Sequence, residues 1–238
     1  MNNPEKDKET LSWLTRAWDD YSDNLPLLLP VLLIQSALTA GSFYLTGRFQ
    51  SLLAAAPYML FVVTPFSIGL NLVYIKIARK SGPRFLDLFG AFPVYHRALA
   101  VSLLLGIMTL GGAVMFLIPG IILYLAFCFS EYAVVDRRTG IKESFLLSAK
   151  ITQGWKGRLF AILSLLLLVN IMVPDIYLVT GPLAKPSASL DLKPWTIAAA
   201  ALKNLVFIPW LSLSMARAYN FLLLNSQPAP VAEESIPV

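Results

Sequence analysis

Residues 98–135 read ALAVSLLLGIMTLGGAVMFLIPGIILYLAFCFSEYAVV and contain a single charged side chain, Glu131. A helix rises about 1.5 Å per residue and the hydrocarbon core of a bilayer is about 30 Å thick, so one crossing needs about 20 apolar residues. The stretch is too long for one crossing. It is interrupted at Pro119 and Gly120, where proline removes a helical donor and glycine permits a tight turn. We therefore predict a helical hairpin that turns at Pro119-Gly120.

Four further stretches of the chain are also long and apolar enough to cross a membrane. With the two arms of the hairpin they make six predicted spans, approximately Leu25–Leu45, Leu52–Ile75, Ala98–Ile118, Gly120–Val135, Leu159–Tyr177 and Thr196–Leu224. Pro209 lies inside the sixth span and predicts a kink or a strong tilt there. Hydrophobic residues make up 57% of the chain and charged residues 14%, whereas soluble domains average about 25% charged residues. We expect an all-α, polytopic membrane protein.

The basic residues indicate how the chain is oriented. Of its 19 Lys and Arg residues, 15 precede the first span, follow the second or the fourth, or lie near the end of the sixth. Basic residues in short loops are retained on the cytoplasmic side, so we expect a multi-pass protein of the cytoplasmic membrane with both termini cytoplasmic. The net charge of +5 is then a topology signal. We expect no nucleic-acid partner, because the basic residues form no dense tract.

Three cytoplasmic segments, each preceding a pair of spans, share an amphipathic pattern at helical spacing. The residues on these faces are Leu11, Leu14, Trp18 and Tyr21; Phe85, Leu88, Phe89 and Phe92; and, more weakly, Ile141, Phe145, Ser148 and Thr152. One interpretation is a threefold repeat in which an interfacial helix precedes two crossings. The other is that any loop near lipid has this pattern. The predicted domains are a cytoplasmic N-terminal segment (1–24), a six-helix transmembrane domain (25–224) and a disordered cytoplasmic tail (225–238).

Ionisable residues inside a span mark a candidate site, because each costs roughly 2.5 to 3.5 kcal/mol near the bilayer centre. Asp175 and Lys203 both lie in the outer half of the predicted bilayer, with Asn170 and Asn204 nearby. In the simpler interpretation Asp175 lies at the interface and Lys203 extends outward to the headgroups. In the alternative the two side chains pair and form an intramembrane polar cluster with the asparagines.

Residues 116–168 contain an ordered series of small and polar positions. They are Pro119, Gly120 and Ile121 at the turn, Asp136 at the end of the next span, Gly140, and Ser148 and Gly154 leading into Trp155. This series resembles the membrane domain associated with glycerophosphoryl diester phosphodiesterases and the related YciC-like membrane proteins of unknown function. The resemblance implies a bacterial-type multi-pass protein linked to lipid metabolism or envelope homeostasis. It transfers no catalytic residue, because phosphodiesterase chemistry belongs to a separate soluble domain.

The polar residues of this series are interpreted as structural. Asp136 either caps the helix that follows it or offsets Arg137 and Arg138, and Thr139 serves as the N-cap of the next helix. Glu131 is only about one turn from Asp136, which favours a cytoplasmic interfacial position over a proton relay.

The sequence lacks the residue sets that enzymes need. It has one cysteine, Cys128, and one histidine, His96, so neither a disulfide nor a paired-cysteine metal cage is available. The P-loop, the nucleophile elbow and the H-E-x-x-H pattern are also absent. We expect no catalytic, cofactor-binding or metal-binding residue.

Two functions agree with these expectations. The first is a lipid-associated or partner-binding component of membrane and envelope homeostasis, with membrane lipids and another membrane or transporter subunit as partners. The second is a small transporter, lipid translocator or permease subunit, which predicts a polar crevice that reaches the membrane midplane.

Overall fold

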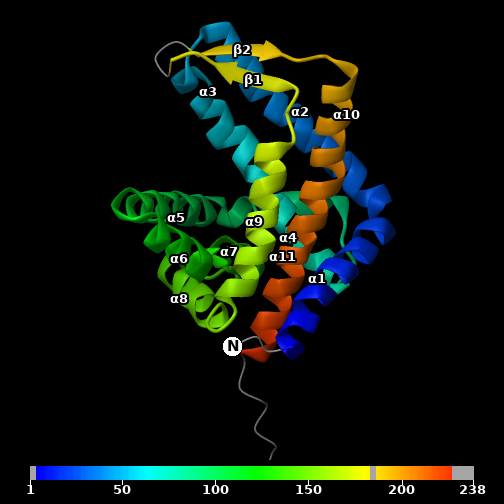
Figure 1. Cartoon of the computed structure of the whole chain (residues 1–238), viewed down its shortest axis with the longest axis vertical. Coiled ribbons are helices and arrows are strands. Elements are labelled where there is room, and N and C mark those ends of the chain that lie inside the picture. Colours follow the sequence, from blue (N-terminus) through cyan, green and yellow to red (C-terminus); the bar gives the residue numbers. More distant parts are fainter. Residues whose placement is uncertain (1–3, 183–185, 227–238) are drawn as a thin grey trace, which may run out of the picture.

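The computed structural model describes residues 4–182 and 186–226, which are mostly helical (Figure 1). The helices are α1 (Pro4–Asp23), α2 (Leu25–Phe49), α3 (Leu52–Tyr58), α4 (Thr64–Arg79), α5 (Tyr95–Met115), α6 (Leu117–Phe127), α7 (Ser130–Arg137), α8 (Ile141–Ile151), α9 (Lys156–Met172), α10 (Pro194–Leu202) and α11 (Ile208–Asn225). Two π-helical segments, η1 (Met59–Val63) and η4 (Lys203–Phe207), join α3 to α4 and α10 to α11. Two 3-10 segments, η2 (Phe85–Phe89) and η3 (Phe92–Val94), precede α5.

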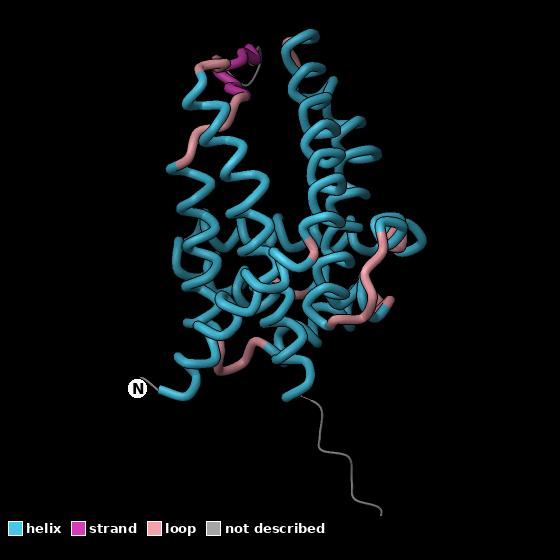
Figure 2. The backbone as a smooth tube through the Cα atoms, turned by 90° about the vertical axis from the view of Figure 1, so that its right-hand side faces the viewer, coloured by secondary structure: helices cyan, strands magenta, loops and turns pink. Residues whose placement is uncertain are grey.

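The predicted all-α class is confirmed, and several helices are apolar enough for a membrane. In the described part of the chain, five helical segments are long and apolar enough to cross a bilayer, and the pair α8–α9, bent by 106°, is a sixth if counted as one span. Six crossings are not confirmed. Helices α2, α9 and α11 run lengthwise, whereas α5 runs across them (Figures 1 and 2).

The hairpin predicted within residues 98–135 is formed by α5 and α6, but its turn was placed wrongly. The chain reverses at Phe116, which has an extended backbone (φ −156°, ψ 136°). Pro119 lies in the first turn of α6, where a missing N–H leaves no helical bond unmade. Gly120 permits close packing of the two arms, because a Cβ there would lie 2.7 Å from the nitrogen of Ala113.

Prolines shape the two long helices that contain π-helical segments. Pro65 and Pro209 each occupy the second position of the α-helix that follows such a segment. Near Pro209, where the sequence predicts a kink or a strong tilt, the structure has a π-helical segment that ends two residues earlier, at Phe207. A proline has no N–H to donate to a carbonyl of the preceding turn, and in both helices a tyrosine hydroxyl from another segment donates to a carbonyl four or five residues before the proline. These bonds are Tyr21 to Leu205 (2.7 Å) and Tyr95 to Leu60.

The segments that precede the pairs of long helices follow a cyclic order of contacts. α1 packs on α11, η2 packs on α4, and α8 packs on α7. Each junction has a polar contact: Arg217 with Asp20 (2.6 Å), Lys76 with Asp87 (2.6 Å), and the Ser148 hydroxyl, which accepts from the main-chain N–H of Phe129, the N-cap residue of α7 (3.2 Å). η2 and α8 thus contact the α-helix that precedes them in the sequence, and α1 contacts the last helix. The threefold repeat stays a prediction.

The segments predicted to be amphipathic differ in detail from the prediction. In α1 the buried face consists of Trp13, Ala17 and Tyr21, whereas Leu11 and Trp18 are 62% and 47% exposed. The second segment forms 3-10 turns and the third forms α8. Of the predicted tail, residues 227–238 lie outside the described residues.

A small antiparallel hairpin, which the sequence did not predict, joins α9 to α10. Strands β1 (Tyr177–Thr180) and β2 (Ser187–Leu190) pair with Tyr177 opposite Leu190. The hairpin lies against α2, at the end of the molecule opposite the described N-terminus (Figure 1). The fifth predicted span ends earlier than expected, at Met172, because Val173 is extended and precedes Pro174.

Candidate functional site

Polar side chains gather inside the bundle, in a cavity of about 410 Å³ between α2, α4 and the α10–α11 helix. Its polar lining consists of Gln35, Ser36, Thr39, Ser67, Asn71, Tyr74, Asp175, Tyr177, Asn204 and Ser212. Polar groups in an apolar bundle are costly unless they are hydrogen-bonded, and they commonly mark a binding site or a pathway. This cavity is therefore the candidate site.

Lys203 and Asp175 form an ion pair at the cavity. The Lys203 ammonium lies 2.6 Å from a carboxylate oxygen of Asp175 and donates to the carbonyl of Val173 at 3.0 Å. The side chain of Lys203 is 1% exposed and that of Asp175 is 46% exposed. The interpretation in which Lys203 extends outward is therefore wrong, and the pairing alternative describes the structure. Pairing arises because the extended chain after α9 brings the carboxylate to the π-helical segment that begins at Lys203.

Of the two asparagines in the predicted cluster, only one belongs to it. The amide of Asn204 donates to the second oxygen of Asp175 at 3.1 Å, so both carboxylate oxygens are engaged. Asn170 is exposed and its amide donates to the carbonyl of Leu166, in its own helix, at 2.9 Å. Asn170 faces away because α9 presents it on the outer side.

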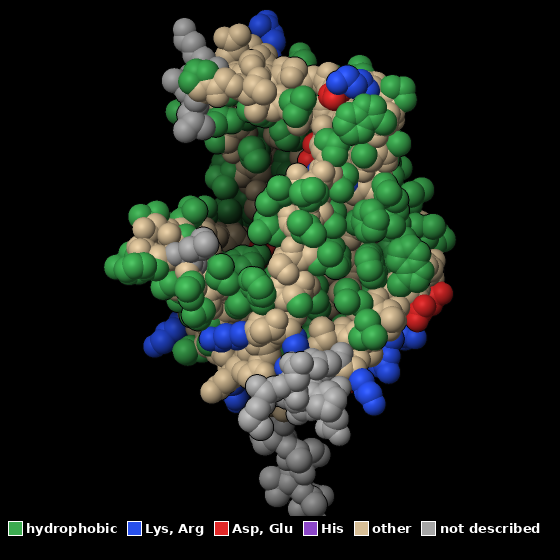
Figure 3. All heavy atoms as spheres, in the orientation of Figure 1, with side chains coloured by type: hydrophobic (Ala, Val, Ile, Leu, Met, Phe, Trp, Pro, Cys, Tyr) green, Lys and Arg blue, Asp and Glu red, His purple; other side chains and the backbone are tan. Residues whose placement is uncertain are grey.

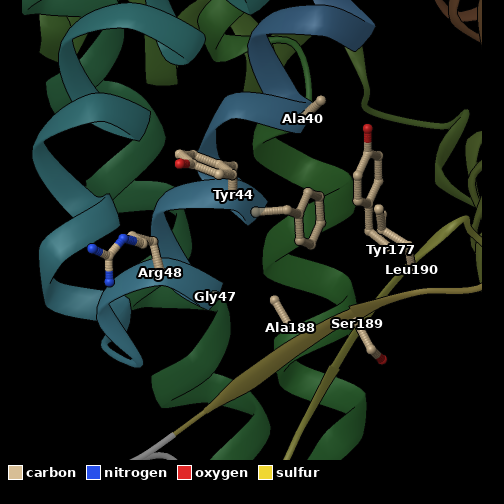
Figure 4. A pocket seen from close by; sticks show the side chains of 9 residues that line it. Ala40, Tyr44, Gly47, Arg48, Tyr177, Ala188, Ser189 and Leu190 are labelled. Carbon is tan, nitrogen blue, oxygen red and sulfur yellow. The ribbon is translucent and has the colours of Figure 1, made fainter.

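Two further cavities adjoin the first. One of about 280 Å³ lies between α2 and α10, and shares Ser36, Asp175 and Asn204 with it. The other, of about 460 Å³, lies between α2 and the β-hairpin (Figure 4). Tyr177 lines all three cavities. Its ring stacks on that of Phe43, with centroids 4.7 Å apart and planes 4° from parallel. We call the three adjoining cavities the crevice.

Most polar residues of the crevice were not singled out in the sequence, and four of them share a spacing that could have been recognised. Gln35 and Thr39 are one turn apart on α2, and Ser67 and Asn71 are one turn apart on α4. The amide of Gln35 donates to the hydroxyl of Ser67 at 2.6 Å, joining the two helices. The missed signal is the i, i+4 spacing, which puts two polar side chains on one face of an apolar helix.

Asp136 joins three helices and does not have either of its predicted roles. Its two oxygens accept from the Arg79 guanidinium, each at 2.9 Å, and one also accepts from the Tyr219 hydroxyl at 3.2 Å. The bidentate pair holds α7 to α4, and the phenol adds α11. Asp136 is held by Arg79 rather than by Arg137 or Arg138, because α7 turns its carboxylate toward the centre of the bundle.

The predicted N-cap of α8 is also wrong. Gly140 is the N-cap residue, and its main-chain N–H donates to the carboxylate of Glu143 at 3.1 Å. The hydroxyl of Thr139 is buried and has no hydrogen-bond partner among the residues that the structure describes.

Residues 4–182 and 186–226 contain no group of three or more His, Cys, Asp or Glu side chains placed to hold a metal ion. Comparison of the chain with protein-family models, curated proteins and solved structures found no match. The candidate site therefore rests on its own geometry.

Proposed function

We propose that this protein is a membrane protein without catalytic machinery that binds the polar group of a lipid or similar amphiphile, as a component of membrane or envelope homeostasis. The observation that carries the proposal is the polar crevice inside an apolar bundle. Its hydroxyl, amide and carboxylate groups suit a polar headgroup. The helices around it expose large apolar side chains, such as Leu33 on α2 and Ile197 on α10, along which an acyl chain can lie.

The proposal includes an orientation in the cytoplasmic membrane. Basic side chains gather at the end of the molecule from which the N-terminal helix starts, and few lie at the β-hairpin end (Figure 3). That end is cytoplasmic in our proposal, by the positive-inside rule. The lengthwise helices cross the bilayer, α1 and α8 lie at its cytoplasmic surface, and the α5–α6 hairpin lies crosswise within it. The crevice then opens in the outer half.

The test is lipid retention by a variant with a filled crevice. Ser36 lines two of the cavities, so Ser36→Phe fills them. Leu53→Phe adds a ring at a residue that is 84% exposed and lines none of the three cavities. After purification in mild detergent, lipid extracted from each protein is quantified by mass spectrometry. We expect Ser36→Phe to lose a lipid that the wild type and Leu53→Phe retain. Equal lipid in all three proteins contradicts the proposal.

A second candidate function is a small transporter, lipid translocator or permease subunit. The observation that favours it is a polar link out of the crevice, from Asn71 to Glu131 on α7. Its test is saturable uptake of a defined solute into liposomes, abolished by the double substitution Asp175→Asn and Lys203→Met. That substitution removes both charges together, so neither member of the pair is left without its counter-ion. If uptake is saturable and depends on the pair, this function replaces the first.

A further inference from the structure

Glu131 lies between three helices and has two neutral hydrogen-bond donors. It belongs to α7, and its two oxygens accept from the amide of Asn71 on α4, at 2.5 Å, and from the hydroxyl of Ser102 on α5. α7 packs against both α4 and α5, which places this carboxyl group among three helices. The cytoplasmic interfacial position expected from the sequence stays a prediction.

None of the cations on the neighbouring helices, within the described chain, is paired with Glu131. On α4, Lys76 pairs with Asp87 and Arg79 with Asp136. The charged residues of α8 (Lys142, Glu143 and Lys150) are exposed, as are His96 and Arg97 at the start of α5. Tyr95, the first residue of α5, is half-buried and its hydroxyl donates to the carbonyl of Leu60. The phenols of Tyr124 on α6 and Tyr132 on α7 lie close enough to Glu131 to interact with it electrostatically. Glu131 is thus a carboxyl group without a counter-charge.

Such a group is balanced between two states. Transfer away from water disfavours a carboxylate that has no cation, and protonation removes that cost. The two hydrogen-bond donors have the opposite effect, because each donates to one oxygen and stabilises the carboxylate. The Ser102 hydroxyl can serve both states, because a hydroxyl donates to a carboxylate and accepts from a carboxylic acid.

We propose that Glu131 is a proton-binding site whose occupancy is coupled to the crevice through Asn71. On uptake, a proton from water forms an O–H bond at the oxygen facing Ser102, and the hydroxyl changes from donor to acceptor. Release returns the proton to water and restores the carboxylate. Asn71 donates a hydrogen bond to Glu131 and also lines the crevice. The charge of Glu131 therefore determines the strength of the hydrogen bond that positions Asn71 in the crevice. The proposal stands whether the crevice binds a lipid or a solute.

The test is an infrared pH titration of the full chain in detergent micelles. A protonated carboxylic acid has a carbonyl stretch that is separate from the amide bands and shifts in D₂O. Each of the chain's 14 Asp and Glu residues gives such a band once it is protonated, so the band of Glu131 is isolated as the difference between the wild-type and Glu131→Gln spectra. We expect that difference to contain one band that titrates as a single step. The matched control is Asp19→Asn, which removes an exposed carboxylate that makes no described contact, and it should keep the band. If no band at any pH is lost on Glu131→Gln, the proposal is wrong.

A second variant tests the proposal should Glu131→Gln fail to fold. Asn71→Leu removes the donor to the oxygen that remains a carbonyl when the acid is protonated, and it leaves the acid in place. The band should move to higher frequency, because a carbonyl with fewer hydrogen bonds is stiffer. An unmoved band in Asn71→Leu shows that it belongs to another acid and overturns the assignment.

Coupling to the crevice is measured separately. In a Cys128→Ser background, which removes the one cysteine, Ser36→Cys places a thiol in the crevice. Its alkylation rate should show an extra step at the pH where the Glu131 band titrates, and Asn71→Leu should abolish that step while the band persists. Identical pH profiles with and without Asn71 contradict the coupling.

Discussion

The hydroxyl of Tyr21 donates to the main-chain carbonyl of Leu205 at 2.7 Å, across 184 residues of sequence. Leu205 lies four residues before Pro209, whose missing N–H leaves that carbonyl without its helical donor. The bond therefore satisfies an acceptor that the final helix cannot satisfy by itself. It also fastens α1, which begins the chain, to the helix that ends the bundle.

Tyr21→Phe should destabilise the protein by roughly 1 kcal/mol, the usual cost of removing one partner of a hydrogen bond. In a Pro209→Ala background, Tyr21→Phe should lower the free energy of unfolding by less than it does in the wild type, because alanine restores an N–H for the carbonyl. Unfolding in detergent, followed by circular dichroism, measures both. Tyr44→Phe is the control, since Tyr44 is 69% exposed and its hydroxyl has no described bond. Additive losses in the double variant would show that the carbonyl does not depend on Tyr21.

The Tyr21 bond should also have a characteristic pH dependence. Burial raises the pKa of the Tyr21 phenol, so the folded protein keeps the proton that the bond needs. A raised folded pKa contributes stability that is present below the unfolded value, about 10, and is lost as the pH rises through the folded value. The difference in Tm between wild type and Tyr21→Phe should be constant around neutral pH and shrink in strongly alkaline buffer. A difference in Tm that grows in alkaline buffer would contradict this prediction.

The Lys203–Asp175 pair should respond asymmetrically to its two single substitutions. Asp175→Asn leaves a fully buried ammonium without its counter-ion and should cost about 3 kcal/mol. Lys203→Met leaves a carboxylate that is 46% exposed and still bonded to Asn204, so its loss should be smaller. Unfolding in detergent ranks the two variants. The double substitution should recover part of the free energy of unfolding that Asp175→Asn loses. If Lys203→Met is the less stable single variant, the buried geometry of Lys203 is contradicted.

The long helices were predictable because length and hydropathy are local properties of the chain. α2 and the helix from Pro194 to Asn225 lie where apolar runs lie. The contacts between helices were not predictable in the same way. That Lys203 pairs rather than extending outward depends on the path of Val173 and Pro174 after another helix. The turn at Phe116 was misplaced because proline is as well suited to the first turn of a helix as to a loop.

The junction of α8 with the hairpin should depend on one hydroxyl. The buried Ser148 hydroxyl donates to the carbonyl of Ala126 at 2.9 Å and accepts from the N–H of Phe129 at 3.2 Å, bridging the break between α6 and α7. Ser148→Ala leaves that N–H without a partner, for a loss of about 1 to 2 kcal/mol. Ser164→Ala is the control, because its hydroxyl is bonded within its own helix to Ala161. Equal free energies of unfolding for the two variants would show that the break between α6 and α7 does not depend on the Ser148 hydroxyl.

The crosswise hairpin should be sensitive to added volume at only one of two glycines. A Cβ at Gly120 would lie 2.7 Å from the nitrogen and 2.9 Å from the Cα of Ala113, both backbone atoms, so the helices must separate to admit it. A Cβ at Gly106, in the middle of α5, would meet nothing within 4 Å. Gly120→Ala should therefore destabilise the protein by about 1 to 3 kcal/mol. Gly106→Ala should stabilise it by roughly 0.5 to 1 kcal/mol, since alanine loses less backbone entropy in a helix. Unfolding in detergent compares the two variants. Because both changes add the same methyl group to an apolar surface, effects of the same sign would mean that α5 and α6 do not pack at Gly120.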